Sequence, residues 1–240
     1  MIDVAGKRAL VTGAGIRVGR AIADGLVDAG VQVAFHYNGS AEGAEAGVAR
    51  AHARATQAIA LQANLLEDEQ ARALPGRAHQ ELGGLDLLVN SAALFERTPF
   101  EQIATRDLDR MLGLGFRAPF LLCQAAAPFL RASRGSIVNL LDIAAERPWV
   151  GYAHYCAAKA ACRMLTLSLA KELAPEIRVN GVEPGMVLPP ENETEHAQRV
   201  ARIPLRRQGS PGDVAEAVLF LWRNAYLNGA ILPVDGGARL

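Results

Sequence analysis

Short runs of apolar residues alternate along the chain with longer segments in which apolar residues recur at helical spacing. The short runs are apolar almost throughout, which is typical of parallel strands that are covered on both faces of a sheet. They predict strands at Arg8–Thr12, Val31–His36, Gln57–Gln62, Leu85–Val89, Ser136–Leu141, Ile177–Val182 and Ala230–Val234. The longer segments predict helices at Gly19–Ala29, Ala41–Arg54, Glu67–Leu82, Asp107–Leu130, Tyr152–Leu173 and Pro211–Trp222.

The regular alternation of strands and helices predicts right-handed strand–helix–strand units around one sheet. We therefore expect a single doubly wound α/β domain over residues 1–240, with a parallel sheet in the strand order 3-2-1-4-5-6-7 and helices on both faces. The least regular segment is Pro184–Pro204, which contains the acidic residues Glu191, Glu193 and Glu195. A connection of this length is usually a lid or a binding loop, here over residues 186–203.

Composition and charge exclude several classes of partner. The 240 residues include 25 Lys and Arg and 25 Asp and Glu, so the formal net charge is zero, whereas nucleic-acid-binding proteins usually have a basic excess. Aromatic residues make up only 5% of the chain, which is too few for a platform that stacks single-stranded bases. The most apolar segment, Ala118–Leu130, is interrupted by Gln124 and Pro128 and is too short to span a bilayer.

Signals for export and for metal binding are equally weak. The first ten residues lack the apolar core of a signal peptide. The cysteines, Cys123, Cys156 and Cys162, are odd in number and form no CxxC pair, which suits a reducing compartment. The five histidines show no paired spacing for a metal. We expect a cytoplasmic protein without a metal site.

Glycines cluster where the first predicted strand meets the first predicted helix. Gly13 and Gly15 permit a tight turn and a close approach of the backbone, and Gly19 lets the helix pack on the strand. The start of the helix then offers unpaired N–H groups and a positive dipole to a pyrophosphate. A glycine turn also occurs wherever a positive φ is needed, but its place after the first strand favours dinucleotide binding.

The end of the second predicted strand indicates which dinucleotide binds. NAD enzymes place Asp or Glu there to hold the ribose 2′-OH, whereas residues 33–40 contain no carboxylate. Arg17, His36 and Ser40 are placed to surround a 2′-phosphate, which a guanidinium binds strongly. A solvated Arg17 is the alternative, although its charge opposes the helix dipole unless an anion is near. The sequence therefore favours NADPH.

Tyr155 and Lys159 lie four residues apart near the start of a long predicted helix, so they share one face. A phenol with an ordinary pKa of about 10 is a poor acid–base group at neutral pH. A neighbouring ammonium stabilises the phenolate and lowers the pKa of the phenol toward the working range. The same spacing is common in helices with a packed Tyr and a solvated Lys, so the pair gains meaning only from its surroundings.

Those surroundings resemble the short-chain dehydrogenase/reductase family over residues 5–238. The matching motifs are Thr12-Gly13, Asn64-Leu65, Asn90–Ala93, Tyr155 with Lys159, Arg178–Gly185 and Pro233–Gly237. More narrowly, the chain is similar to the pteridine reductase branch, including bacterial dihydromonapterin and dihydrofolate reductases of this type. Arg17 stands at the usual middle glycine of the turn, His36-Tyr37 ends the second strand, and Asp142 replaces the usual catalytic Ser.

The resemblance implies roles for the matching positions. It implies that Tyr155 donates the proton, that Lys159 binds the nicotinamide ribose, and that Asp142 assists as a hydrogen-bond partner of Tyr155 or of the pterin. Phe95 is implied to stack on the pterin, and Arg17 to lie near both a phosphate and the substrate. The implied cofactor contacts are Gly13, Ile16, Arg17, Val18, His36, Tyr37, Ser40, Asn64, Leu65, Ser91, Ala92, Tyr155, Lys159, Pro184 and Gly185.

The residues themselves leave alternatives open at two of these positions. Asp142 ends a central strand, at the edge where such sheets bind ligands, but it is also suited to capping a turn. Its charge would raise the pKa of Tyr155 and oppose Lys159, so the two groups would titrate together. Phe95 is equally suited to a place in the core.

Two departures from the family pattern stand out. Gly115 occupies the position of an Asn that supports a water chain to the lysine, and Asn64 replaces the usual Asp that contacts adenine. The family also implies a homotetramer. The helices predicted at Asp107–Leu130 and Tyr152–Leu173 agree with this, since they are too apolar to have a single buried face.

The expected function is NADPH-dependent reduction of a dihydropterin, such as dihydrobiopterin, dihydromonapterin or dihydrofolate, to its tetrahydro form. The first alternative is a short-chain carbonyl reductase acting on a ketone, for example a 3-oxoacyl thioester. That reaction needs a hydroxyl donor beside Tyr155, for which Asp142 substitutes poorly unless it is protonated. The second alternative, a non-catalytic NADPH-binding regulator, is suggested only by Gly115.

Overall fold

A single parallel sheet forms the centre of the molecule and confirms the predicted strand order. The computed structural model describes residues 1–188 and 193–240. Its seven-stranded sheet runs β3-β2-β1-β4-β5-β6-β7, and every neighbouring pair is parallel. The strands are β1 Arg8–Val11, β2 Gln32–Tyr37, β3 Ala58–Gln62, β4 Leu87–Asn90, β5 Ser136–Leu140, β6 Arg178–Pro184 and β7 Ile231–Val234. All seven predicted strands are present, and none of their ends differs from the prediction by more than two residues.

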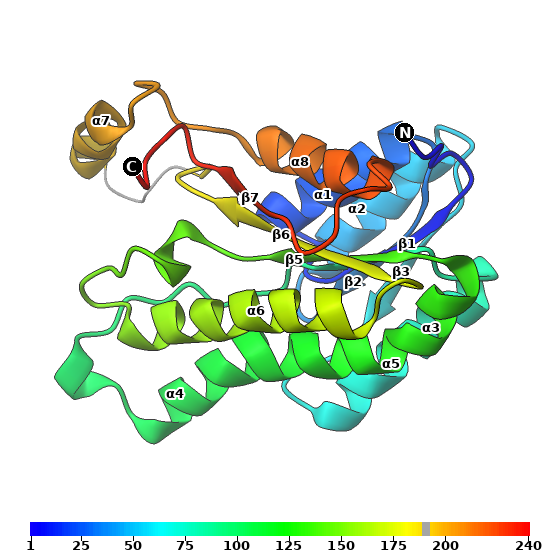
Figure 1. Ribbon diagram of the computed structural model, residues 1–240, viewed down its shortest axis with the longest axis horizontal. Helices are drawn as coiled ribbons and strands as arrows, with labels where there is room; N and C mark the ends of the chain where they lie inside the picture. The colour runs from blue at the N-terminus through cyan, green and yellow to red at the C-terminus, as the bar shows by residue number, and fades with distance from the viewer. Residues whose placement is uncertain (189–192) are drawn as a thin grey trace.

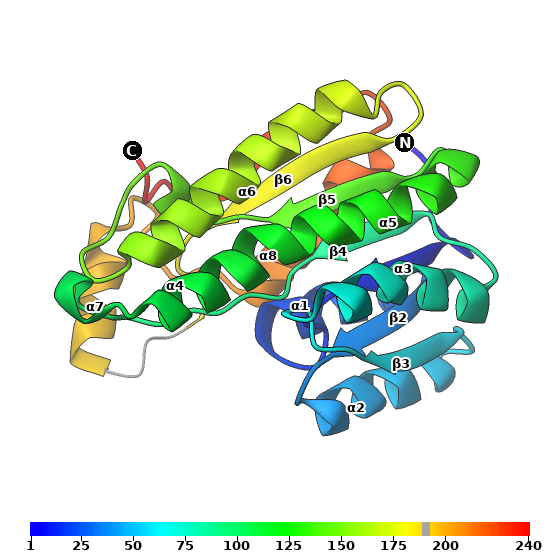
Figure 2. The same cartoon turned by 90° about the horizontal axis from the view of Figure 1, so that it is seen from below.

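Helices cover both faces of this sheet, as Figures 1 and 2 show. One face carries α1 (Arg17–Asp28), α2 (Ala41–His52) and α8 (Pro211–Arg223). The other carries α3 (Asp68–Leu82), α5 (Ala118–Ser133) and α6 (Ala153–Glu172). Side chains of a strand alternate between the faces. Thus Ala9 and Val11 join one buried cluster and Leu10 joins the other.

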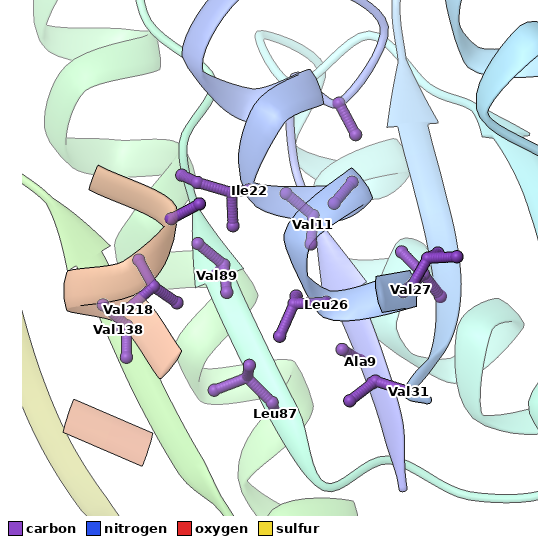
Figure 3. Close-up of a cluster of buried hydrophobic side chains, with 14 of the residues drawn as sticks. Ala9, Val11, Ile22, Leu26, Val27, Val31, Leu87, Val89, Val138 and Val218 are labelled. Carbon is purple, nitrogen blue, oxygen red and sulfur yellow. The ribbon is translucent and has the colours of Figure 1, made fainter. Parts of the chain in front are cut away.

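The first of these clusters fixes α1, whose start borders the glycine turn. Figure 3 shows Ile22 and Leu26 of α1 among side chains from the sheet and from α8, which include Val89 and Val218. Leu26 is fully buried, and burial of a leucine side chain contributes about 1.5–3 kcal/mol. This packing holds the start of α1 at a fixed place over the sheet.

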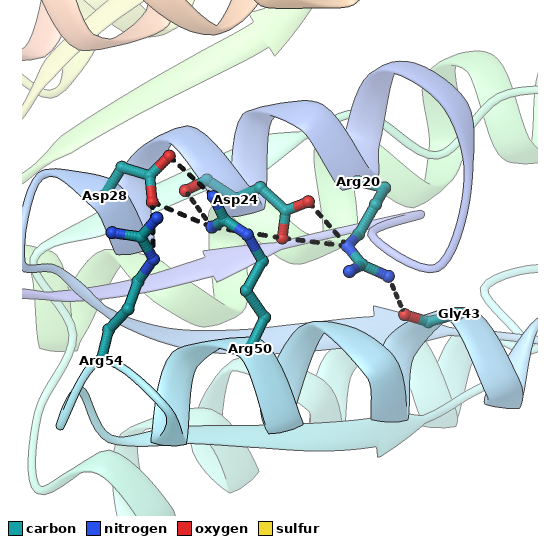
Figure 4. Close-up of polar contacts among 6 residues, drawn as sticks. All are labelled: Arg20, Asp24, Asp28, Gly43, Arg50 and Arg54. Atoms are coloured by element: carbon teal, nitrogen blue, oxygen red, sulfur yellow. Dashed lines mark hydrogen bonds and ion pairs between the residues drawn. The ribbon is translucent and has the colours of Figure 1, made fainter.

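A network of ion pairs and hydrogen bonds connects α2 to α1 on the surface (Figure 4). Asp24 and Asp28 of α1 pair with Arg50 of α2, and Arg20 donates to the carbonyl of Gly43. Arg50 lowers the pKa of the Asp28 carboxyl by its hydrogen bond and its charge. Such half-exposed pairs contribute about 0–1 kcal/mol each, so they orient α2 more than they stabilise it.

The long helix predicted at Asp107–Leu130 is interrupted. The structure has α4 (Thr105–Leu112), a widened π turn, η2 (Gly113–Arg117), and then α5. Pro119 lies in the first turn of α5 and has no N–H to donate to a carbonyl of the preceding π turn. Short 3-10 turns lie at η1 (Phe100–Gln102) and η3 (Ile143–Ala145). The periodicity of apolar residues did not reveal the interruption.

The segment predicted as irregular, Pro184–Pro204, contains a helix, α7 (Glu193–Arg202), so this prediction was wrong for its second half. The sequence of α7 is rich in polar helix-forming residues, whereas the prolines at 189 and 190 indicated a loop. Glu191 lies outside the described residues. No described helix is long and apolar enough to cross a membrane. No cluster of His, Cys, Asp and Glu suited to a metal occurs in the described part of the chain.

Candidate active site

The glycine turn between β1 and α1 is packed tightly against the end of β4. Thr12 Oγ1 accepts hydrogen bonds from the N–H groups of Ser91, at 2.9 Å, and Ala92, at 3.1 Å. Gly13 has a φ of +66°, and a Cβ there would lie 2.9 Å from the Cα of Ala92. Both the conformation and the close approach therefore require glycine. This arrangement brings the predicted residues Gly13, Ser91 and Ala92 together.

The start of α1 fits a phosphate group. Ile16 is the N-cap residue and supplies no side-chain hydrogen bond, so the first N–H groups of the helix lack a side-chain acceptor. Ile16 is 55% exposed, and Val18 packs against the core. Ser40 lies against the turn, where a Cβ on Gly15 would overlap its hydroxyl. The turn thus has the donors and the glycine-lined approach that a dinucleotide pyrophosphate needs.

Arg17 extends from this turn into solvent. Arg17 is exposed, and its backbone adopts a φ of +55°, in the left-handed region that favours glycine. Its guanidinium has no hydrogen bond or ion pair with any other residue in the described ranges. Arg17 and Ser40 therefore flank the same turn, and their contact with a 2′-phosphate stays a prediction.

The prediction for His36 needs a correction. The ring is 2% exposed, its Nδ1 accepts from the Gly13 N–H at 3.1 Å, and its Nε2 lies 3.1 Å from the Ala63 carbonyl. These partners require the Nε2–H tautomer and leave no ring nitrogen for a phosphate. Burial lowers the pKa of His36 to about 4, so the ring is neutral. His36 supports the glycine turn from below, while its neighbour Tyr37 is half-buried against the core.

This buried histidine predicts a loss of stability in acid. Its pKa is about 4 in the folded protein and about 6.5 in the unfolded chain, so protons bind the unfolded chain first. The free energy of unfolding is unaffected by this group above pH 6.5. As the pH falls from 6.5 toward 4, protonation of His36 in the unfolded chain lowers the free energy of unfolding, by about 3 kcal/mol in all. His36→Asn keeps an acceptor near Nδ1 but does not titrate. Urea unfolding at neutral and acidic pH should show a smaller acid loss in the variant, and equal losses would contradict this role.

The residues predicted to lie near adenine occupy the turn between β3 and α3. Asn64 accepts from the Leu66 N–H through its side-chain oxygen at 3.1 Å, and Leu65 is buried. The side-chain oxygen of Asn64, which we expected to accept an adenine N–H, therefore already accepts a hydrogen bond within this turn. Only its second lone pair is left for adenine.

At the end of β5, a carboxylate meets the phenol of α6. Asp142 Oδ2 accepts from the Tyr155 hydroxyl at 2.7 Å, and Asp142 Oδ1 accepts from the Ala144 N–H at 2.8 Å. Lys159, one helical turn beyond Tyr155, donates from Nζ to the Leu140 carbonyl at 2.8 Å. Its Nζ lies 5.8 Å from the centre of the Tyr155 ring. The structure thus unites the three predicted catalytic residues, and Asp142 also caps the turn η3.

The pKa of Tyr155 differs from the expectation that the charge of Lys159 would lower it. Burial raises the pKa of Tyr155 well above its usual value, and the charge and hydrogen bond of Asp142 raise it further. Burial raises the pKa of Asp142, although the hydrogen bond from the Ala144 N–H and the charge of Lys159 act to lower it. Burial lowers the pKa of Lys159. Tyr155 therefore keeps its proton at neutral pH, in the state required of a proton donor.

Lys159 has hydrogen-bonding capacity that fits a bound ribose. The side chain is buried and its ammonium carries three N–H groups, of which one meets Leu140. Pro184 ends β6 beside β7, and the next residue, Gly185, donates from its N–H to the Val234 carbonyl at 3.0 Å. Their contact with the nicotinamide carboxamide stays a prediction.

Three aromatic rings surround the phenol of Tyr155, and only Phe95 among them was predicted from the sequence. The ring of Phe95 is 48% exposed, stacks on Tyr152 with centres 5.0 Å apart, and meets Tyr155 edge-on at 5.2 Å. Trp149 lies nearly parallel to Tyr155 at 6.4 Å. Phe95 thus belongs to the rim of the site rather than to the core. Trp149 and Tyr152 precede Tyr155 by a few residues, and this proximity in sequence was the signal that could have identified them.

A buried polar network that the sequence analysis also missed connects β4, β5 and α6. Asn90 Nδ2 donates to Asn139 Oδ1 at 2.8 Å, and Asn139 Nδ2 donates to Thr166 Oγ1 at 2.8 Å. Gly115, in the π turn, lies so close to α6 that a Cβ there would be 2.9 Å from the Cβ of Ala158. These contacts fix the depth at which α6 presents Tyr155 and Lys159.

The comparisons with known proteins agree with this architecture. Residues 13–239 match the family model described as Enoyl-(Acyl carrier protein) reductase. The chain is 34% identical to the 3-oxoacyl-[acyl-carrier-protein] reductase of Staphylococcus aureus, covering 96% of this chain and 97% of that protein.

Solved structures are also similar to this chain over nearly their whole length. A short-chain dehydrogenase from Burkholderia cenocepacia in complex with NADP is 36% identical, covers 100% of both chains, and has a TM-score of 0.94. A blue fluorescent protein from a metagenomic library in complex with NADPH is 33% identical, covers 99% of both chains, and has a TM-score of 0.92. The chain belongs to the short-chain dehydrogenase/reductase family.

Proposed function

We propose that this chain is an NADPH-dependent reductase that uses Tyr155 as its proton donor. The observation that carries the proposal is the 2.7 Å hydrogen bond between a protonated Tyr155 and Asp142, next to the buried Lys159. The glycine turn, the start of α1 without a side-chain cap, and the Arg17 guanidinium, which has no partner among the described residues, support binding of NADPH. The cofactors of the structures from Burkholderia cenocepacia and from the metagenomic library support it as well. When bound, NADPH supplies the hydride.

The residues of the chain supply and control the proton. Tyr155 transfers its hydroxyl proton to the substrate atom that gains negative charge, and the Lys159 ammonium stabilises the phenolate that remains. Leu140 holds Lys159 in place through its carbonyl. Asp142 holds the phenol in one orientation through its hydrogen bond, and burial raises the pKa of the Asp142 carboxyl. General acid catalysis of this kind contributes about 10²–10⁴-fold to a rate.

A ketone is the substrate class that the comparisons support better. The relative from Staphylococcus aureus is named for reduction of a 3-oxoacyl group, and the matching family model is also named for an acyl-carrier-protein substrate. The objection that a carboxylate cannot donate to a ketone oxygen weakens here, because burial raises the pKa of Asp142. A protonated Asp142 can donate one hydrogen bond and Tyr155 another.

A dihydropterin is the second candidate, and the aromatic rim favours it. Phe95, Tyr152 and Trp149 lie around the Tyr155 phenol, and Phe95 has an exposed face. Flat heterocycles bind by stacking on such rings. The Asp142 carboxylate can also accept N–H groups of a pterin, which a serine hydroxyl would do less well.

Loss of NADPH absorbance with an acetoacetyl thioester, a 7,8-dihydropterin and dihydrofolate tests the proposal and separates its two substrate classes. We expect oxidation with at least one substrate. Asp142→Ser keeps a short oxygen-bearing side chain that can still cap η3. If the substrate is a pterin, this variant should lose about tenfold or more of its activity. If it is a ketone, activity should persist or rise, and no oxidation with any substrate would favour the non-catalytic regulator.

We also propose that the protein is a homotetramer. Helices α5 and α6 present apolar side chains to solvent, including Phe120, which is 41% exposed, and Met164, which is 61% exposed. Apolar residues exposed on neighbouring helices favour contact with another subunit. Light scattering at micromolar concentration should report a tetramer, and a monomer would count against it.

A further inference from the structure

A bridge of charges lies behind the catalytic residues and is not part of the mechanism above. Glu183 is on β6 and is only 1% exposed. The Nε of Arg163, on α6, donates to Glu183 Oε1 at 2.9 Å. The Nη2 of the same guanidinium pairs with Glu146 Oε1 at 2.5 Å. One arginine therefore joins a buried carboxylate to a half-exposed one.

The bridge ends on the turn that carries Asp142. Glu146 directly follows η3, and its N–H donates to the Ile143 carbonyl at 3.1 Å. The Ala145 N–H donates to the Asp142 carbonyl at 3.0 Å, and Asp142 Oδ1 accepts from the Ala144 N–H. Residues 142–146 are thus one hydrogen-bonded unit. A displacement of Glu146 therefore also displaces the Asp142 carboxylate, which accepts the hydrogen bond from Tyr155.

The other end of the bridge is rigid. Glu183 lies within the sheet, and Arg163 follows Lys159 by one helical turn on α6, which runs along β6 in Figure 2. A buried carboxylate is costly unless it is paired and hydrogen-bonded, so Glu183 fixes the position of the guanidinium. Arg163 thus connects the buried Glu183 on β6 to Glu146, which directly follows the turn η3.

We propose that Arg163 is a positioning residue for the reaction. By bridging Glu183 and Glu146 it sets the turn at residues 142–146, and through this turn it sets the distance between Asp142 and the Tyr155 hydroxyl. The role rests on the proposed function only for its effect on turnover. Its effect on the Asp142–Tyr155 hydrogen bond is independent of any substrate.

The test compares Arg163→Gln and Glu146→Gln with the control Arg50→Gln, which removes a similarly half-exposed arginine from the ion pairs between α1 and α2. In the first two variants we expect kcat to fall about tenfold with little change in NADPH affinity, since small displacements of reacting groups are costly. The double variant should have a kcat no lower than that of the slower single variant, because both substitutions break the same contact between Arg163 and Glu146. The control should match the wild type.

A second readout needs neither substrate nor cofactor. In protein labelled at the tyrosine Cζ, the Tyr155 resonance is identified by its loss in Tyr155→Phe. Arg163→Gln should move this resonance toward its position in Asp142→Ala, in which the hydrogen bond is gone. A purely structural role for Arg163 would lower the melting temperature without moving the resonance.

An unchanged resonance together with unchanged kcat would overturn the proposal. If Arg163→Gln does not fold, Glu146→Gln decides by the same two readouts, because Glu146 is on the surface. If the wild type reduces no substrate, the proposed function fails while the resonance still tests the position of Asp142. A shift in Arg50→Gln of the same size would also overturn the proposal, since the effect would then follow loss of any surface arginine.

Discussion

Replacement of Tyr155 by Phe should reduce kcat by about 10²–10⁴-fold and leave the affinity for NADPH nearly unchanged. The variant lacks only the hydroxyl that donates to Asp142 at 2.7 Å, and Lys159 keeps its bond to the Leu140 carbonyl. Steady-state kinetics with the preferred substrate measures the first effect. Titration of NADPH fluorescence measures the second.

Tyr152→Phe is the matched control for this variant. It removes a hydroxyl from the neighbouring ring, which stacks on Phe95 at 5.0 Å, but leaves the bond between Tyr155 and Asp142 in place. Its kcat should stay within a few-fold of the wild type. Tyr155→Phe should also lose about 1–3 kcal/mol of stability, since the largely buried Asp142 loses a donor. Wild-type turnover in Tyr155→Phe would remove Tyr155 from the chemistry.

Replacement of Arg17 by Gly should weaken NADPH binding by about 10–100-fold, and NADH binding far less. A charged hydrogen bond contributes about 1.5–3 kcal/mol, and only NADPH has the 2′-phosphate that the guanidinium would meet. Arg17 is exposed at the turn before α1 and has no partner among the other described residues. Titration of both cofactors against wild type and variant measures the difference.

The backbone at Arg17 provides an internal control. Its φ of +55° is unfavourable for any side chain and suits glycine, by about 1 kcal/mol. Arg17→Gly should therefore raise the melting temperature slightly, whereas Arg17→Ala should not, although both lose the same guanidinium. Equal losses for the two cofactors in either variant would assign the recognition of the 2′-phosphate to another group.

The spacing of apolar residues was sufficient to predict the sheet. Strands such as Ser136–Leu140 are buried on both faces, as is typical of a parallel sheet covered by helices on each side. The order of the strands followed because connections of one hand leave few topologies. The interrupted helix at Gly113–Arg117 and the helix α7 were missed, because each depends on local backbone effects that periodicity does not record.

The site was predicted unevenly for a related reason. Tyr155, Lys159 and Asp142 were identified from their places in motifs, and the structure brings them together. His36 was assigned to a phosphate because it ends a strand beside the turn, but its ring points inward to Gly13. The direction of a side chain at a strand end depends on its neighbours in space, which the sequence does not specify.

The sequence by itself determined the family, the parallel sheet and the choice of candidate catalytic residues, because these follow from the order of apolar segments and from short motifs. Only the tertiary structure decided that Tyr155 keeps its proton, that His36 is a support, and that Arg163 links Glu183 to the turn of Asp142. Burial and the pairing of charges arise when segments distant in sequence meet, and these two effects set the proton affinity of a buried group.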